Sequence, residues 1–173
     1  MKEENAMNKK EQYDNTNLML RQAFYRLMND FKVPSVDDIC KEANIHHQTF
    51  YKHFQTKQEF YIHVCNVNEN LFYNKYKDLN LLDFIKQILE KGFCKQECFI
   101  PYLKDDDLSK LVYLSLKDSL SKKLDKENKF SLDEKKFILG GLIFYILESF
   151  KNTDVALADA ILGVEVIFNK LNI

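Results

Sequence analysis

Apolar residues recur along this chain at the three- and four-residue spacing of amphipathic α-helices, and the breaks between such stretches are short. The first stretch runs from about Thr16 to Asn29. Seven more helices are expected over about Ser35 to Ala43, His46 to Phe54, Thr56 to Lys77, Leu81 to Phe93, Asp106 to Leu124, Leu132 to Phe150 and Asp154 to Leu171. With a short additional piece before Tyr102, the pattern predicts an all-α protein of about nine helices.

Polar residues mark the ends of the early helices. Ser35 is a good N-cap, and Asp38 follows it three residues later. Thr56 and Glu59 repeat this capping box before the fourth helix. Asn44 tolerates the left-handed backbone conformation, so we expect a tight turn there. The second and third helices are therefore predicted to be joined by a short turn.

The last two helices are apolar over more than half of their circumference. Ser131 and Glu134 form a capping box before the first of them, and Thr153 is placed to cap the second. One small core cannot bury so much apolar surface, so part of it is expected to face a partner subunit.

Composition agrees with a helical protein, because the chain has only 4 Gly and 2 Pro and is 46% hydrophobic. Its 173 residues suffice for a small headpiece and a larger body. We predict a flexible arm over 1–14, a small helical domain over 15–60, and a larger helical domain over 61–173 that includes the surface for a partner subunit. The first residues are polar and include acids, and no apolar run has the length of a membrane span, so a cytoplasmic protein without a signal peptide is expected.

The third helix decides whether residues 35–54 form a helix-turn-helix that reads DNA. If Phe50 and Phe54 face inward, the helical period turns Gln48 and Lys52 outward, with Thr49 and Tyr51 beside them. These side chains have the groups that bind base edges and phosphates. His46 and His47 lie at the start of this helix, the end that enters the major groove in many such motifs.

The charge around the third helix supports DNA binding, whereas the net charge of the whole chain does not. The formal net charge is -1, so nothing in the whole-chain balance indicates nucleic acid. The segment from Ala43 to Gln58, however, has no acidic residue and contains Lys52 and Lys57. The alternative from periodicity alone is a plain helical hairpin with a polar face, acting as an interaction module that does not bind DNA.

The segment SVDDICKEANIHHQTFYKHFQTKQEF resembles the N-terminal signature of the TetR/AcrR family of transcriptional regulators. The resemblance covers about Leu18 to Phe60. The matching positions are Ser35, Ile39, Ala43, Asn44, Tyr51, His53, Phe54 and Lys57. Asn44 departs from the glycine that the family most often has, although Asn adopts the same backbone conformation. The QTFYKHF segment is most similar to a low-GC Gram-positive branch that includes activators of dihydroxyacetone-kinase operons.

The resemblance implies roles for individual residues. Ser35, Tyr51, His53 and Lys57 would hold phosphates. The residues that would approach base edges or neighbouring phosphates are His46, His47, Gln48, Thr49 and Lys52. The family binds palindromic operators as homodimers, so we expect a dimeric repressor that a small-molecule effector releases from DNA.

Family dimers form through the last two long helices. Gly140 and Gly141 would allow close helix approach there, although simple tolerance of glycine explains them equally well. The residues predicted for the interface are Gly140, Gly141, Ile161, Val164, Ile167 and Phe168.

The family implies a small-molecule effector in the helical body, and aromatic residues there are the candidates for its pocket. They are Phe84, Phe93, Phe99, Tyr102, Tyr113, Phe144 and Tyr145. Taken one at a time, each is better explained as core packing. A pocket of this kind would favour an apolar or aromatic effector. A regulator of the same fold that is controlled by a protein partner, including an activator, is the alternative.

Other chemistry finds little support. No phosphate-binding glycine loop, nucleophile elbow or His-Glu-x-x-His motif is present, so we expect no enzyme activity and no cofactor. Cys94 and Cys98 are spaced to share a helix face, but no nearby histidine completes a metal site. They are interpreted as reduced, buried thiols, with a redox role as the alternative.

Overall fold

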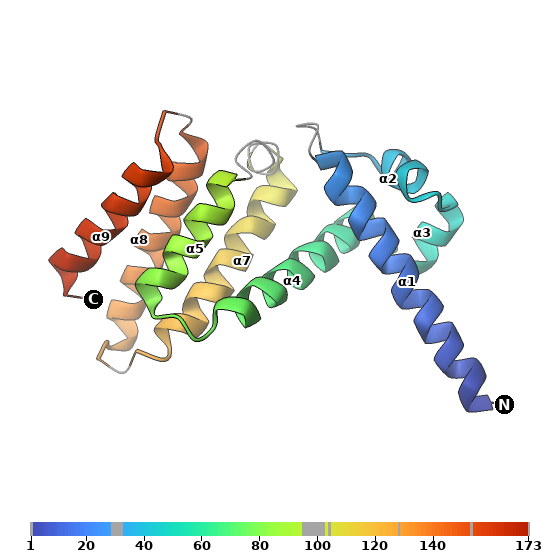
Figure 1. The fold of residues 1–173 in the computed structure, drawn as a ribbon, viewed down its shortest axis with the longest axis horizontal. Coiled ribbons are helices and arrows are strands. Elements are labelled where there is room, and N and C mark those ends of the chain that lie inside the picture. Colours follow the sequence, from blue (N-terminus) through green and yellow to red (C-terminus); the bar gives the residue numbers. More distant parts are fainter. Residues whose placement is uncertain are drawn as a thin grey trace. The chain divides into compact units, whose positions relative to one another are not determined.

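The computed structural model describes residues 2–28, 33–94, 103, 105–127, 129–152 and 154–172. Within these residues the chain is all-helical and contains no strand, as predicted (Figure 1). The helices are α1 (Lys2–Met28), α2 (Val36–Ala43), α3 (His47–His53), α4 (Lys57–Tyr76), α5 (Leu81–Cys94), α7 (Asp106–Leu124), α8 (Leu132–Lys151) and α9 (Leu157–Leu171). The piece expected before Tyr102 lies outside the described residues.

The chain divides into two compact units, residues 1–64 and 65–173. Helix α4 runs through the boundary, so its first turns belong to one unit and its last turns to the other. Each unit has its own set of buried apolar residues.

The first unit is built around an aromatic cluster. Phe60 of α4 lies with its ring centroid 5.7 Å from Phe24 of α1, 5.4 Å from Phe50 of α3 and 5.1 Å from Phe54. All four side chains are buried. Aromatic pairs at these separations stabilise a core beyond their buried area. One ring therefore ties the ends of three helices together.

Two helix boundaries differ from the predictions. The expected flexible arm is helical, because α1 begins at Lys2 and not near Thr16. No Gly or Pro interrupts residues 2–28, so nothing local ends the helix. The last helix begins at Leu157 with Ala156 as its N-cap. Asn152 explains the delay, because its side-chain oxygen accepts from the Asp154 amide and holds a turn there.

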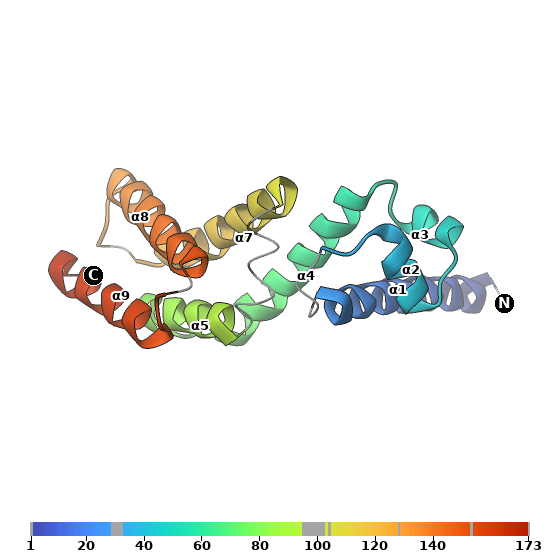
Figure 2. The ribbon, with the colours of Figure 1, turned by 90° about the horizontal axis from the view of Figure 1, so that it is seen from above.

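The second unit packs α5, α8 and α9 around a shared core. Its buried residues include Phe84, Ile85 and Leu89 of α5, Leu142, Ile146 and Phe150 of α8, and Val164 and Phe168 of α9. Figure 2 shows α9 beside α5. Two glycines permit this packing, because a Cβ atom at Gly92 would overlap the Phe150 ring and one at Gly163 would overlap the Tyr145 hydroxyl oxygen.

A buried lysine joins α7 to the end of α4. Lys123 is 3% exposed, and its ammonium donates to the carbonyl oxygens of Tyr76 at 3.1 Å, Lys77 at 2.7 Å and Leu79 at 2.5 Å. The same Nζ lies 4.8 Å from the centroid of the Phe84 ring. Carbonyls at a helix C-terminus lack partners within the helix, so one cation satisfies several at once.

A carboxyl pair forms the other polar contact between α4 and α7. Burial, and then a hydrogen bond to Asp118, raise the pKa of Glu69, while hydrogen bonds with Glu69 and Lys122 lower the pKa of Asp118. The shifts are in opposite directions, so Glu69 is the carboxyl of the pair that holds a proton to the higher pH, and it then donates to Asp118. Lys122 and the Ser119 hydroxyl also contact Glu69.

This pair makes stability depend on pH. A raised pKa in the folded state means that the contribution of Glu69 is lost as the pH rises through that value. Glu69→Gln retains the donor without the titration. We therefore expect its free energy of unfolding, relative to wild type, to increase from pH 5 to pH 8 in urea denaturation. Glu11→Gln, on the exposed surface of α1, should show no such trend, and parallel curves for all three proteins would contradict this arrangement.

Candidate nucleic-acid interface

Helix α2 and the turn after it have the predicted local geometry. The Ser35 hydroxyl accepts from the Asp38 amide at 3.1 Å, and the Ser35 amide donates to the Asp38 carboxylate at 3.0 Å. Asn44 has φ 54° and ψ 44°, the left-handed conformation. The Ile45 amide then donates to the Cys40 carbonyl at 2.9 Å, which closes the turn. These bonds set the angle at which α3 leaves α2.

Helix α3 buries one side and exposes the other. Phe50 is fully buried, whereas Gln48 and Lys52 are exposed and Tyr51 is 50% exposed. Thr49 is half-buried between them. His46 is the N-cap residue of α3. Its exposed imidazole makes no capping hydrogen bond to the first turn of the helix. The polar face predicted for this helix is therefore the one that reaches solvent.

The three acids of α2 are each held by a neighbour. Asp38 accepts from the Ser35 amide in the capping box, and Glu42 lies 2.6 Å from Arg26 Nε of α1. Asp37 lies 2.5 Å from His47 Nε2, at the start of α3. Because these carboxylates have local partners, they weaken the positive potential of the acid-free segment 43–58 less than free acids would.

Comparison with known proteins adds an independent observation. Residues 30–64 match the family model for bacterial regulatory proteins of the tetR family, N-terminal part. This segment of the chain is similar to the DNA-binding part of that family. The match spans α2, α3 and the first turns of α4, the same elements whose geometry is given above. No curated protein matches the chain at a significant level.

Two solved structures have a similar fold over more than nine tenths of the chain. A TetR transcriptional regulator from Streptococcus agalactiae 2603V is 21% identical, with a TM-score of 0.66, over 94% of this chain and 98% of that one. GusR of Salmonella enterica is 12% identical, with a TM-score of 0.65, over 91% and 95%. These likenesses show that the chain shares the fold of these two proteins. The assignment to a Gram-positive branch stays a prediction.

His53 of the TetR-type domain is held by α1. Its ring stacks on Tyr13 with centroids 4.0 Å apart and planes 16° apart, and its Nδ1 lies 2.6 Å from Asn17 Oδ1. Burial lowers the pKa of His53, which favours the neutral ring. Its inferred contact with phosphate stays a prediction, but this environment favours positioning α3. Tyr13 and Asn17 were missed by sequence reasoning, although they continue the i, i+4 register that leads to Leu20 and Phe24.

Lys57 begins α4 beside the turn that ends α3. Its Nζ lies 5.0 Å from the centroid of the Tyr61 ring, and the Tyr61 hydroxyl donates to the Pro34 carbonyl at 3.3 Å. Cation–π contact orients an ammonium without neutralising it. Tyr61 therefore contacts both Lys57 and Pro34, the residue that precedes Ser35.

The aromatic residues predicted for an effector pocket are not gathered around one cavity. Phe84 is fully buried in the core, Phe93 packs edge-on against Phe150, and the Tyr145 hydroxyl donates to the Ala160 carbonyl at 2.9 Å. Tyr113 and Phe144 are exposed. Phe99 and Tyr102 lie outside the described residues. For the described members, core packing and surface exposure replace the pocket interpretation.

The residues predicted for the dimer interface differ in how deeply they are buried. Val164 and Phe168 are buried in their own chain's core, so the interface role assigned to them is wrong. Ile161 and Ile167 are half-buried, and Ile161 packs against that core. Gly140 and Gly141 are exposed, and no neighbouring atom lies within 4 Å of the position that a Cβ atom would take at either residue. The exposed apolar residues of the two helices are instead Leu132, Phe137, Phe144, Leu162, Val166 and Leu171.

The described thiols show no sign of reactivity. Cys40 is buried, and burial raises its pKa; burial, followed by the nearby Glu69 charge, raises the pKa of Cys65 to about 11. A thiol with a raised pKa forms little thiolate. The side chains of Cys94 and Cys98 lie outside the described residues.

In the part of the chain that the structure describes, no three potential ligands group around a metal position, and no helix is long and apolar enough to cross a bilayer.

Proposed function

We propose that this protein is a dimeric transcriptional repressor that binds a palindromic operator and leaves it when a small-molecule effector binds. The observation that carries the DNA part is the acid-free outer face of α3. Gln48 and Lys52 lie one turn apart there, exposed, on a helix whose opposite side is anchored by Phe50. Amide and ammonium groups on a rigid helix are suited to read base edges and hold phosphates.

The remaining DNA contacts are assigned by position. His46 and His47 at the start of α3, with Thr49, approach base edges or the phosphates beside them. Tyr51 and Lys57 hold phosphates, and Ser35 contributes at the start of α2. His53 acts mainly through its packing against α1.

A gel-shift assay with the region upstream of the protein's own operon tests this assignment. Gln48→Ala combined with Lys52→Ala should weaken binding by about a hundredfold, since each contact is worth roughly 1–2 kcal/mol. Lys117→Ala removes one exposed positive charge from α7 and serves as the control, with affinity close to wild type. Equal binding by the double variant and wild type would show that α3 is not the reading helix.

Homodimerisation is supported by the exposed apolar residues of α8 and α9. Phe137 and Phe144 are 79% and 69% exposed and lie two turns apart on α8. Gly140 and Gly141 lie between them, with open space at both Cβ positions. Leu162 and Val166 are exposed one turn apart on α9. Such apolar surface indicates contact with a partner, and we assign it to a second copy of this chain.

Control by a protein partner is the second candidate, and one observation favours it. Tyr113 and Leu114 of α7 are 42% and 45% exposed, on a helix outside the proposed dimer surface. An apolar pair of this kind suits a protein contact better than a small ligand. Leu114→Asp would then abolish regulation without affecting DNA binding or dimerisation.

A further inference from the structure

The first turns of α1 continue past the contact that joins this helix to α3. Tyr13 stacks on His53, the last residue of α3, with ring centroids 4.0 Å apart, and its hydroxyl donates to the His53 carbonyl at 3.4 Å. Asn17 Oδ1, one turn later on α1, lies 2.6 Å from His53 Nδ1. Because α1 begins at Lys2, several of its turns extend beyond this contact, as Figure 1 shows. Both helices belong to the first unit.

Two exposed lysines, Lys9 and Lys10, lie on this part of α1. They precede Tyr13 by about one turn, and the helical period places Lys9 about 40° to one side of it and Lys10 about 60° to the other. Glu11 is about 160° from Tyr13, on the opposite side of the helix. No acidic residue stands three or four positions from Lys9, and for Lys10 the only one is Asp14. The side of α1 that contacts α3 therefore continues as a positively charged surface.

The contact between the two helices changes which groups face phosphates at the end of α3. Tyr13 covers one face of the His53 ring, and burial lowers the pKa of His53, which favours a neutral ring with little attraction for phosphate. Exposed ammonium groups come instead from Lys9 and Lys10 of α1 and from Lys52 of α3. The charged surface of α1 is thus continuous with the polar face of the helix proposed to read bases.

We propose that the first turns of α1 form a second DNA-binding element, in which Lys9 and Lys10 hold phosphates beside the bases that α3 reads. The occupant of this surface is the sugar-phosphate backbone of the same operator, since an ammonium is a point charge that attracts phosphate without selecting a base. The contact of Tyr13 with His53 places the two lysines next to the end of α3. This inference rests on the proposed function and adds to it a source of affinity.

Gel shifts over a series of salt concentrations test the proposal, with the region upstream of the protein's own operon as the probe. Lys9→Gln combined with Lys10→Gln should weaken binding and reduce the slope of log affinity against log salt by about one for each lysine removed from the complex. Lys9→Arg combined with Lys10→Arg retains both charges and should bind like wild type. A wild-type slope in the glutamine variant would overturn the proposal.

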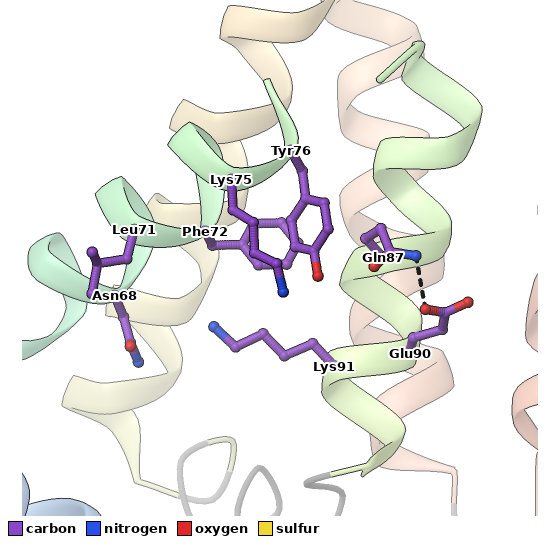
Figure 3. A pocket seen from close by; sticks show the side chains of 8 residues that line it. All are labelled: Asn68, Leu71, Phe72, Lys75, Tyr76, Gln87, Glu90 and Lys91. Atoms are coloured by element: carbon purple, nitrogen blue, oxygen red, sulfur yellow. Dashed lines mark hydrogen bonds between the residues drawn. The ribbon is translucent and has the colours of Figure 1, made fainter. Parts of the chain in front are cut away.

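A matched control removes two lysines from the second unit. Lys75 lies beside the open groove between α4 and α5 that Figure 3 shows, and Lys110 is exposed on α7. Lys75→Gln combined with Lys110→Gln makes the same change in net charge outside the first unit, and its salt slope should equal that of wild type. Equal losses in this control and in the α1 variant would mean that net charge sets the affinity, and would overturn the proposal. Circular dichroism checks that each variant is folded, and single variants replace a double variant that is not.

Hydroxyl-radical footprinting at saturating protein locates the contact on the operator. Wild type should protect a few sugars next to each stretch that α3 covers, and the α1 glutamine variant should lose this protection while retaining that of α3. Identical footprints for the two proteins would overturn the assignment to α1.

The same gel shifts separate this inference from the proposed function. If wild type binds the operator and the α1 glutamine variant has an unchanged slope, the α1 proposal fails and the regulator proposal stands. If wild type does not bind the operator, the regulator proposal fails and the α1 proposal fails with it.

Discussion

Phe144→Asp is expected to convert the protein from a dimer to a monomer. Phe144 is 69% exposed on α8, and its side chain takes no part in the core of the second unit. At the centre of an interface, its replacement removes an aromatic anchor and buries a carboxylate on each side of the symmetry axis. A loss of about 4 kcal/mol would raise the dimer dissociation constant by about a thousandfold. Sedimentation equilibrium measures this directly.

Leu114→Asp provides the matched control for dimerisation. Leu114 is also an exposed apolar residue of a long helix, but it belongs to α7. We expect this variant to remain dimeric, and we expect the far-ultraviolet dichroism of both variants to match wild type. A wild-type mass for Phe144→Asp would show that α8 does not form the interface.

Lys123→Met should lower the free energy of unfolding by about 3 kcal/mol, because three carbonyl oxygens lose a donor that is itself buried. Methionine matches the length of the stem, so the packing against Phe84 changes little. The loss comes from the carbonyls of Tyr76, Lys77 and Leu79, which end α4 and lead toward α5. Urea denaturation at one fixed protein concentration gives the value, since dimerisation would couple stability to concentration.

Lys126→Met tests whether burial is the cause. Lys126 is exposed and donates to the same Lys77 carbonyl at 3.4 Å. An exposed contact of this kind is worth roughly 0.5 kcal/mol. Similar losses in the two variants would mean that the triple carbonyl contact of Lys123 adds nothing to stability.

Local signals made the DNA-binding elements predictable. A capping residue such as Ser35, a left-handed residue such as Asn44 and an inward pair such as Phe50 and Phe54 act over one or two turns. Their consequences can be worked out without knowing what else packs nearby. The outward positions of Gln48 and Lys52 follow from the same helical period.

Long-range packing explains the predictions that failed. Helices α8 and α9 are apolar on several faces, so periodicity does not show whether Val164 or Val166 enters the core. A glycine in the sequence does not show where helices pack closely either. Gly140 and Gly141 face open space, whereas Gly92 and Gly163 each contact an aromatic ring from another helix. The contact of Tyr13 with His53 joins residues 40 positions apart. Such a contact leaves no local pattern beyond the register of α1.

The pairing of His47 with Asp37 fixes which edge of the imidazole points away from the protein at the start of α3. His47 Nε2 lies 2.5 Å from Asp37 Oδ1, so this nitrogen donates to the carboxylate of α2. Nδ1 is then the ring nitrogen left for a partner outside the chain. A single carboxylate on α2 thereby orients a side chain that belongs to α3.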